Sequence, residues 1–347
     1  MLIDTDAVRS GEELDVAALA NYLRGKIESA DGIRVAQFPK GHSNLTYLVE
    51  AGGREYVLRR GPLGPVPPKA HDMAREYRIL AAIHPHFPEA PGVFHLCEDT
   101  ALMGAVFFLM ERRRGLVLRD SIPGEILRTS DYPQRISEAF IGCLVRLHKV
   151  DVVKTGLLAL GKPEGFLERQ VEGWAERWLR AKTSEIPAMD EVIGWLRERR
   201  PASGAPTLVH NDYKLDNLML PFDSVDRIEA VLDWEMTTVG DPLADLGLTL
   251  CYWLVDGLNG PSVTQQPGWY SREQLVNRYA ELSGRDVSQI GYHEVLGVFK
   301  LAVILQQIYF RFRRGQTADR RFEKFDEQVE ALIHRAAELA EHCGRGG

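Results

Sequence analysis

The spacing of apolar residues changes in character partway along the chain. Before about residue 110, short apolar runs alternate with turn residues, and after about residue 125, apolar residues recur three or four positions apart. Short runs bounded by Gly, Pro and Asn are typical of strands, whereas the longer spacing lines one face of a helix. The pattern therefore predicts a sheet in the first part of the chain and mainly helices in the second.

Five antiparallel strands and one inserted helix are predicted in the first part. The strands are expected at residues 33–38, 45–50, 56–59, 92–97 and 105–110. The turn Ala51-Gly52-Gly53 makes a hairpin of the second and third strands. A helix over residues 71–83 is expected between the third and fourth strands, because its apolar residues fall on one side. Another helix, over residues 13–30, is expected before the sheet.

The second part is predicted to be helical apart from one hairpin. Helices are expected around residues 136–147 and at residues 166–182, 189–199, 272–283, 292–313 and 322–342. Residues 218–220 and 228–232 are mainly apolar, and the Pro, Asp and Ser residues between them are typical of a turn. We therefore predict an α+β protein of two lobes, residues 1–112 and 113–347, with a linker near residues 111–115. A cleft between two such lobes is a natural ligand site.

A polar stretch before the hairpin indicates the chemistry. The apolar run Thr207-Leu208-Val209 leads into His210-Asn211-Asp212-Tyr213-Lys214-Leu215-Asp216-Asn217, and Asp233 follows Asn217 by sixteen residues. Because a hairpin brings its two ends together, we expect Asn217 beside Asp233, close enough to share one metal ion. Phosphoryl transfer requires a carboxylate that orients a hydroxyl, and an amide and a carboxylate that hold Mg²⁺. The alternative is a polar loop whose Asp and Asn only cap turns.

This stretch resembles the catalytic loop of the protein-kinase-like superfamily, most closely that of its aminoglycoside phosphotransferase and choline kinase branch. Val231-Leu232-Asp233-Trp234-Glu235 and Gly240-Asp241-Pro242-Leu243-Ala244-Asp245-Leu246 look like the second signature of that branch. The resemblance implies a two-lobed protein-kinase-like fold, with a small five-stranded antiparallel lobe and a larger helical lobe. It also implies that Asp212 is the catalytic base, that Asn217 and Asp233 hold Mg²⁺, that Asp245 braces the catalytic loop, and that His210 ties the loop to its surroundings.

Lys214 matches the lysine that protein kinases place two residues after the base. A cation at that position would neutralise charge on the transferring phosphoryl group. The alternative is a solvated lysine, because lysine side chains are mostly exposed.

The same resemblance assigns a nucleotide site to the first lobe. Arg59, at the end of the third strand, stands where kinases have a lysine, and its guanidinium offers a fork suited to phosphate. Glu76, on the following helix, is the matching acid. The alternative for Arg59 and Glu76 is a surface ion pair that contributes little.

Two further segments of the first lobe are expected to contact the nucleotide. Gly41-His42-Ser43-Asn44 joins the first two strands, and a glycine there lets backbone N–H groups approach phosphates closely. Residues 106–112 resemble the strand and hinge that hold adenine. Backbone groups of Glu111 and Arg112 would contact the base, and Met110 would pack nearby.

The overall composition is typical of a soluble globular protein. The chain has 347 residues, of which 45% are hydrophobic and 26% charged, as in ordinary soluble globular proteins. Its net charge of −7 does not favour a nucleic-acid partner. The four cysteines lie far apart, which favours reduced thiols in a cytoplasmic protein over a disulfide frame or a zinc site. The N-terminus lacks the pattern of a secretory signal, and the apolar residues 298–310 are too few and too polar to span a membrane.

The expected acceptor is a small molecule with a hydroxyl group, and the expected cofactors are ATP and Mg²⁺. Seven residues separate Asp233 from Asp241, where protein kinases carry a long activation segment that ends in Ala-Pro-Glu. A protein kinase is therefore disfavoured. A pseudokinase that binds nucleotide as a scaffold remains open, because Arg59 replaces the usual lysine.

Residues 41–47, 56–60 and 210–213 most resemble the kinase-like domain that occurs alone in bacteria and fused to some acyl-CoA dehydrogenases. This resemblance implies hydroxyacyl substrates, with CoA thioesters as one form. Aminoglycosides and choline are the alternatives, but residues 151–205 hold nine acidic and nine basic residues, without the acidic excess that a cationic substrate favours. Six basic residues between 311 and 324 form a cluster that could meet a CoA phosphate or belong to a solvated helix end.

Overall fold

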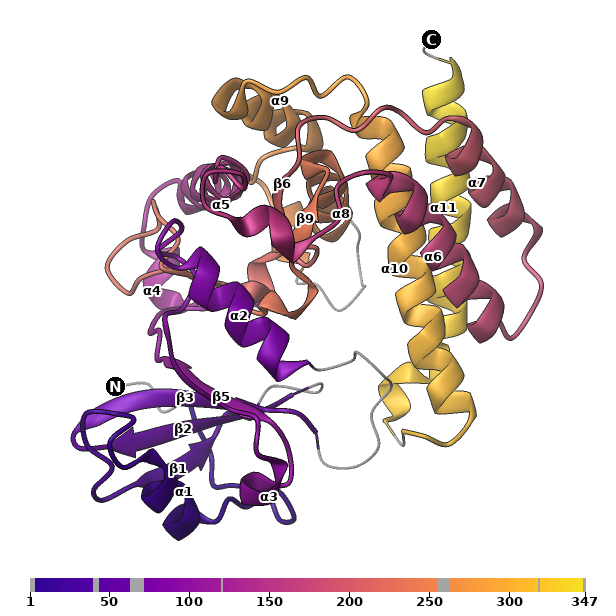
Figure 1. Ribbon diagram of the computed structural model, residues 1–347. Helices are drawn as coiled ribbons and strands as arrows, with labels where there is room; N and C mark the ends of the chain where they lie inside the picture. The colour runs from indigo at the N-terminus through magenta and orange to yellow at the C-terminus, as the bar shows by residue number, and fades with distance from the viewer. Residues whose placement is uncertain are drawn as a thin grey trace. The chain divides into compact units, whose positions relative to one another are not determined.

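The computed structural model describes residues 4–39, 44–62, 72–119, 121–254, 262–317 and 319–345. The chain divides into two compact units. The first, here called the sheet unit, comprises Met1–Gly115 and Glu229–Glu235. The second, the helical unit, comprises Leu116–Ile228 and Met236–Gly347. Figure 1 colours the chain by residue number, so most of the sheet unit is indigo to purple.

The sheet unit is built on five strands, as predicted. They are β1 (Arg34–Gln37), β2 (Leu45–Ala51), β3 (Arg54–Arg60), β4 (Val93–Cys97) and β5 (Phe107–Glu111). Their order is β1-β2-β3-β5-β4, and every neighbouring pair is antiparallel. Alternate residues of β2 are buried, as expected for a strand with one face on a core. The predicted α+β fold with a five-stranded antiparallel sheet is confirmed.

Three helices accompany the sheet: α1 (Val16–Leu23), α2 (Met73–Ile83) and α3 (Thr100–Met103). α2 is the predicted helix between β3 and β4, and Asp72 caps it by accepting a hydrogen bond from the N–H of Arg75 (2.9 Å). The helix expected over residues 13–30 is shorter, because the chain leaves the helix at Arg24 and Gly25 has a positive φ of 73°. The short α3 was not expected.

Alternating residues of the central strands face two different helices. Phe107 and Leu109 of β5 join a core that includes Leu19 and Leu23 of α1. Phe108, between them, faces the other way, and its ring contacts that of Tyr77 on α2 (6.1 Å between centroids). Successive side chains of a strand point to opposite faces of the sheet. The side chains of the neighbouring β3 therefore also alternate between the face towards α1 and the face towards α2.

One segment from late in the sequence completes the sheet unit. Glu229–Glu235 contains the short strand β8 (Ala230–Val231), and the N–H of Val231 donates to the carbonyl of Glu89 in the loop after α2 (2.8 Å). The indole of Trp234 packs edge-on against Phe87 (5.9 Å between centroids). Backbone pairing and aromatic packing therefore hold the segment that carries Asp233 within this unit.

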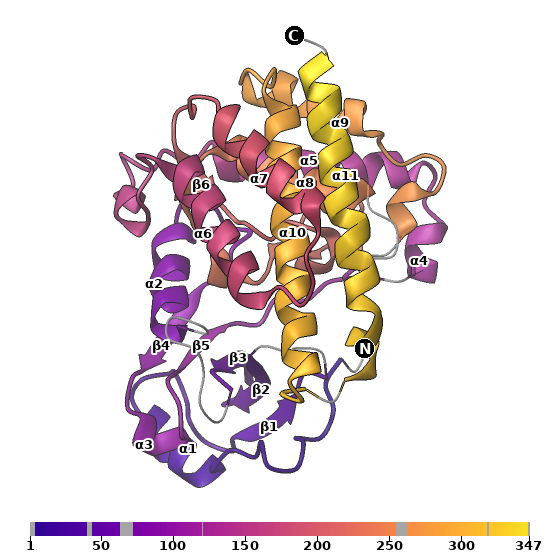
Figure 2. The same ribbon diagram turned by 90° about the vertical axis from the view of Figure 1, so that its right-hand side faces the viewer.

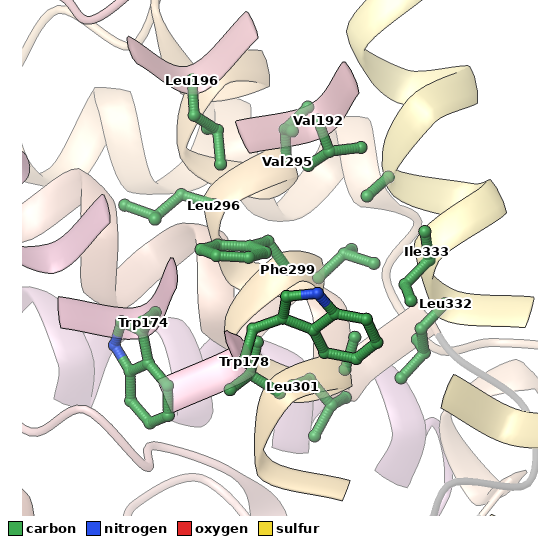
Figure 3. Close-up of a cluster of buried hydrophobic side chains, with 14 of the residues drawn as sticks. Trp174, Trp178, Val192, Leu196, Val295, Leu296, Phe299, Leu301, Leu332 and Ile333 are labelled. Carbon is green, nitrogen blue, oxygen red and sulfur yellow. The ribbon is translucent and has the colours of Figure 1, made fainter. Parts of the chain in front are cut away.

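The helical unit contains eight α-helices among the residues that the structure describes. They are α4 (Gly124–Leu127), α5 (Tyr132–His148), α6 (Phe166–Ala181), α7 (Pro187–Glu198), α8 (Pro242–Leu254), α9 (Arg272–Ser283), α10 (Ile290–Arg313) and α11 (Phe325–Arg345). α10 packs against α6, α7, α8 and α11 (Figure 2). Figure 3 shows Phe299 of α10 among Trp178, Leu196 and Ile333 from the surrounding helices.

α10 is the core helix of this unit. By length and apolar composition it resembles a membrane-spanning helix, but 67% of its most apolar window is buried inside the protein. A helix that is apolar on all sides is expected at the centre of a bundle. The helices predicted at 166–182, 189–199, 272–283, 292–313 and 322–342 correspond to α6, α7, α9, α10 and α11 within a few residues.

A short antiparallel ladder leads into the polar loop. β6 (Thr207–Val209) pairs with β9 (Thr238–Gly240), and Thr207 lies opposite Gly240. β9 was not expected. Gly240 is needed at this position because a Cβ atom there would lie 2.4 Å from the ring of Phe166. After β6 come the loop, a 3₁₀ turn at Leu215–Asn217 and the short strand β7 (Leu218–Met219).

Candidate active site

Asp245 on α8 anchors the start of the polar loop. One of its oxygens, Oδ2, accepts a hydrogen bond from the N–H of His210 (2.6 Å), and Oδ1 accepts one from the N–H of Asn211 (2.7 Å). His148 of α5 lies 3.2 Å from Oδ2 through its Nε2. Asp245 is 0% exposed. Burial by itself disfavours the charged carboxyl group, but His148 and the donated hydrogen bonds outweigh it and lower the pKa of Asp245.

His148 and His210 are both buried and both face this loop. His148 Nδ1 lies 2.8 Å from the hydroxyl of Tyr279 on α9. His210 Nδ1 accepts a hydrogen bond from the N–H of Asp212 (3.3 Å). Asp245 of α8 thus holds the beginning of the loop directly, and His148 of α5 and Tyr279 of α9 extend the hydrogen-bond network behind Asp245.

Asn211 adopts an uncommon backbone conformation. Its φ is 64°, in the left-handed region that Asn tolerates better than most residues. Its Nδ2 donates to the carbonyl of Met236 (3.1 Å), and its Oδ1 accepts from the ammonium of Lys300 on α10 (3.2 Å). The side chain therefore links the loop to the core helix.

Asp212 lies in a cluster with two of the other residues singled out in the sequence. Asn217 Nδ2 donates to its Oδ2 (2.7 Å) and to its backbone carbonyl (2.9 Å). Lys214 Nζ lies 3.2 Å from its Oδ1 and above the ring of Tyr252 (4.9 Å). The 3₁₀ turn at Leu215–Asn217 shortens the chain so that Asn217 can reach back. Asp212 keeps 20% of its side chain exposed.

A second cluster of charged side chains lies in the sheet unit. Arg59 Nη1 is 2.9 Å from Oε1 of Glu76, and Arg59 Nη2 is 3.4 Å from Oδ1 of Asp233. Arg59 lies opposite Phe108 and so faces α2, whereas Arg60 points to the other side and donates to the carbonyl of Met103 (2.8 Å). The alternation of β3 thus separates a guanidinium in the charged cluster from one in the core.

The pKa values of Glu76 and Arg59 are both raised, with opposite consequences for the charges of the two groups. Glu76 is 1% exposed, and burial raises its pKa to about 7 although Arg59 opposes the shift. The contact with Arg59 is close, but neither oxygen of Glu76 receives an aligned hydrogen bond from the residues that are described. Burial also works against the charge of Arg59, yet Glu76, Asp233 and Glu235 together raise the pKa of Arg59. The guanidinium therefore stays charged, while the carboxyl group of Glu76 is poorly satisfied.

Asp233, like Asn211, has a left-handed backbone, with a φ of 65°. Its side chain is 39% exposed. Next to it, Glu235 accepts a hydrogen bond from Nδ2 of Asn44 (3.0 Å), and its carbonyl accepts one from Arg75 (2.8 Å). Asn211 and Asp233 are thus two non-glycine residues with a left-handed backbone, at or beside residues predicted to act in catalysis or metal binding. Such conformations cluster at active sites.

The structure describes only some of the remaining residues that are predicted to contact the nucleotide. Gly41, His42 and Ser43 lie outside the described residues. Met110 is buried at the end of β5, and the N–H of Glu111 already donates to the carbonyl of Gly92 (2.7 Å). Arg112 lies over the ring of Phe38 (4.7 Å) and pairs with Asp4.

The predicted site residues thus form two groups. The helical unit brings together Asp212, Lys214 and Asn217. Asp245 holds the backbone of His210 at the start of the same loop. Arg59, Glu76 and Asp233 lie together in the sheet unit. Because Asn217 and Asp233 belong to different units, their sharing of one metal ion stays a prediction. Within the described part of the chain, no group of three His, Cys, Asp or Glu residues could hold a metal.

Three residues near Asp212 and its loop were not singled out from the sequence: His148, Tyr252 and Lys300. His148 ends the apolar face of α5, which gives little hint of function. Burial raises the pKa of Tyr252, and its contact with Asp212 adds to the shift. Lys300 carried a usable sign, since a charged residue within a mainly apolar helix must find a partner.

Comparison with known proteins identifies the family. Residues 34–279 match the phosphotransferase enzyme family. Acyl-CoA dehydrogenase family member 10 of Mus musculus is 34% identical over 348 residues, which are 97% of this chain and 32% of that protein. Acyl-CoA dehydrogenase family member 11 of Gallus gallus is 31% identical over 355 residues, which are 97% of this chain and 45% of that protein. The chain therefore spans less than half the length of either relative.

Solved structures agree with this result. A protein of Ralstonia eutropha JMP134, provisionally named an aminoglycoside phosphotransferase, has a TM-score of 0.82 and 30% identity, covering 95% of this chain and 99% of its own. A thermostable mutant of aminoglycoside phosphotransferase APH(4)-Ia, in complex with AMP-PNP and hygromycin B, has a TM-score of 0.61 and 15% identity, covering 95% and 100%. The second likeness shows the fold alone. With the family match over most of its length, this chain belongs to the phosphotransferase enzyme family and has its protein-kinase-like fold.

Proposed function

We propose that this enzyme is an ATP- and Mg²⁺-dependent kinase that transfers the γ-phosphoryl group to a hydroxyl group of a small molecule. The observation that carries this proposal is the cluster around Asp212. The Asp212 carboxylate is partly exposed and is contacted by Asn217 (2.7 Å) and Lys214 (3.2 Å). It lies on a loop whose start is held by Asp245. A preorganised carboxylate of this kind can act as a general base.

In the proposed reaction, Asp212 accepts a hydrogen bond from the substrate hydroxyl and takes its proton. The hydroxyl oxygen forms a bond to the γ-phosphorus while the bond between that phosphorus and the bridging oxygen of ADP breaks. Lys214, beside Asp212, would neutralise charge on the transferred group. Positioning and charge neutralisation supply most of the catalysis in such reactions.

Asn217 and Asp233 would hold the magnesium ion. The side-chain N–H of Asn217 is directed at Asp212, which leaves its amide oxygen as the candidate ligand. Asp233 exposes 39% of its side chain, and amide and carboxylate oxygens suit a hard cation. When bound, Mg²⁺ neutralises charge on the nucleotide phosphates.

The sheet unit, which contains residues 1–112 of the predicted nucleotide-binding lobe, would bind the nucleotide. Arg59 is held by Glu76 (2.9 Å) and would contact the phosphates. Since the N–H of Glu111 is already used within the sheet, its carbonyl and the N–H of Arg112 would contact adenine. Asn44, whose Nδ2 donates to Glu235 (3.0 Å), would contact the nucleotide.

For the acceptor we propose a hydroxyacyl metabolite, free or as its CoA thioester. The names of the two acyl-CoA dehydrogenase relatives support this choice, although the chain matches less than half of each. The basic cluster at residues 311–324 supports it less, because Arg320 pairs with Glu323 (3.1 Å) and Arg321 with Asp319 (2.5 Å). The Ralstonia relative favours an aminoglycoside as the second candidate.

The proposal is tested by assaying ATP turnover with hydroxyacyl-CoAs, hydroxy acids, aminoglycosides and choline. We expect phosphorylation of a hydroxyacyl compound, and we expect Asp212→Asn to lower kcat by a factor of about 10³ or more with little change in ATP affinity. Asp216→Asn, on the same loop, is the matched control. An Asp212→Asn variant as fast as the wild type would remove the assigned base. Binding of Mg-ATP without transfer to any acceptor would favour a nucleotide-binding scaffold instead.

A further inference from the structure

Lys300 is a buried cation at the centre of the helical unit. It lies on α10, the core helix, and is 3% exposed. Burial of an ammonium group in an apolar bundle is costly unless the charge has partners. Burial lowers the pKa of Lys300 to about 8, with Asp245 and Asp212 opposing the shift and Arg177 adding to it. The carboxylates that face it come from α8 and from the catalytic loop, and Arg177 comes from α6.

The ammonium reaches the catalytic loop through one residue. Lys300 Nζ donates to Oδ1 of Asn211 (3.2 Å). The ring of Trp174 on α6 lies 5.8 Å from the same nitrogen. Asn211 immediately precedes Asp212 in the chain, so the contact acts one residue from the proposed base.

Asn211 is a position that needs support. A left-handed backbone costs an ordinary residue roughly 1 kcal/mol or more. The cost is smaller for Asn than for most residues but is absent only for glycine. The backbone N–H of Asn211 is held by Asp245, its Nδ2 by the carbonyl of Met236, and its Oδ1 by Lys300. The three contacts come from three different segments, and together they fix the peptide plane that leads into Asp212.

We propose that Lys300 is a positioning residue for phosphoryl transfer, which acts by holding the side chain of Asn211 and thereby the direction of the Asp212 carboxylate. This inference rests on the proposed function, because it assumes that Asp212 is the base. It also accounts for a charged residue in the centre of an apolar bundle, where an apolar side chain of similar size would pack without the cost of burying charge.

The first test compares Lys300→Met with Gln306→Met. Gln306 is also buried on α10, and its amide donates to the carbonyl of Ala181 (2.8 Å), away from the loop. We expect Lys300→Met to lower kcat by about 10- to 100-fold, with an unchanged KM for ATP and a Tm within a few degrees of the wild type. Gln306→Met should lower the Tm and leave kcat nearly unchanged. If Lys300→Met lowers only the Tm, as the control does, Lys300 is structural and the inference fails.

The second test is a double-mutant cycle with Asn211→Gly. Glycine adopts the left-handed backbone without support and offers no side chain to hold. In that background, Lys300→Met should change kcat by no more than about twofold, because its partner is absent. An equal loss of kcat in both backgrounds would show that Lys300 acts by another route.

The pH profile of kcat separates a role of the charge from one of shape. In the wild type we expect kcat to fall above about pH 8 as Lys300 loses its proton, and Lys300→Met should lose this descending limb. A limb that persists in the variant would contradict the assignment.

The outcome for Asp212→Asn distinguishes failure of the inference from failure of the proposed function. If Asp212→Asn abolishes transfer and Lys300→Met does not affect it, the inference alone is wrong. If Asp212→Asn is active, the proposed base is wrong, and the effect of Lys300→Met on amide hydrogen exchange in residues 207–216 still reports the contact. Unchanged exchange there would overturn the inference independently of catalysis.

Discussion

The two charged clusters of this enzyme treat a buried carboxylate in opposite ways. Asp245 in the helical unit and Glu76 in the sheet unit are 0% and 1% exposed, so both lose their hydration. Asp245 receives two backbone N–H groups and His148, and its pKa is lowered. Glu76 has one close cation without aligned hydrogen bonds, and burial raises its pKa to about 7. Donated hydrogen bonds together with the neighbouring histidines lower the pKa of Asp245, whereas Arg59 alone does not overcome the effect of burial on Glu76.

This difference suggests different tasks. A carboxylate whose oxygens accept hydrogen bonds from fixed backbone donors holds its neighbours rigidly, which suits the loop that carries Asp212. A carboxylate with incomplete partners can adjust when its neighbours change, as suits the acid behind a guanidinium that would meet ATP. The helical unit is therefore expected to be preorganised, and the charged cluster of the sheet unit is expected to be completed by its ligand.

The largest expected effect is that of Asp245→Asn. The amide group places a donor against the N–H groups of His210 and Asn211, so the brace loses at least one hydrogen bond in a fully buried site. We expect the free energy of unfolding in urea to fall by about 3–5 kcal/mol, with a concurrent loss of kcat. A loss below about 1 kcal/mol would remove the contrast between the two carboxylates.

Lys300 should show an intermediate effect that depends on pH. Its folded-state pKa of about 8 lies below its ordinary value of 10.5, so the unfolded chain binds more protons between these two values. Stability therefore rises with pH in that window, and we expect the wild type to gain about 1–3 kcal/mol relative to Lys300→Met between pH 8 and pH 10.5. Parallel urea titrations of both proteins across this range measure the difference. Parallel curves would show that Lys300 titrates normally.

Glu76→Gln should have the smallest effect on stability. The cost of burying the charge of Glu76 is only partly offset by its contact with Arg59, since its pKa is raised, so a neutral amide of the same shape should change the unfolding free energy by no more than about 1 kcal/mol. The KM for ATP should nevertheless rise, because Arg59 loses the acid that holds it. Asp245→Asn and Glu76→Gln are matched amide replacements, and equal effects would contradict the comparison.

Much of the fold followed from local patterns in the sequence. The turn at 51–53, the five strands and the long helices have clear periodicity. The sequence also marked Asp212 and Asn217 as a pair of site residues, although the 2.7 Å contact between them was not predicted. β9 was missed because three residues are too few to show a period. The partners of Asp245 and Asn211 were also beyond reach, since His148 lies 97 residues from Asp245 and Lys300 lies 89 residues from Asn211. Packing of distant helices makes these contacts, and no local pattern encodes it.

The discontinuity of the sheet unit has a consequence for how the enzyme can be made and divided. A fragment that stops at Gly115 would carry all five strands but neither the backbone pairing of Val231 with Glu89 nor Asp233 itself. During synthesis, the sheet unit cannot be completed until the ribosome has passed residue 235, well into the helical unit. Any scheme that severs the protein for split reporters or domain exchange should therefore keep residues 229–235 with the N-terminal piece.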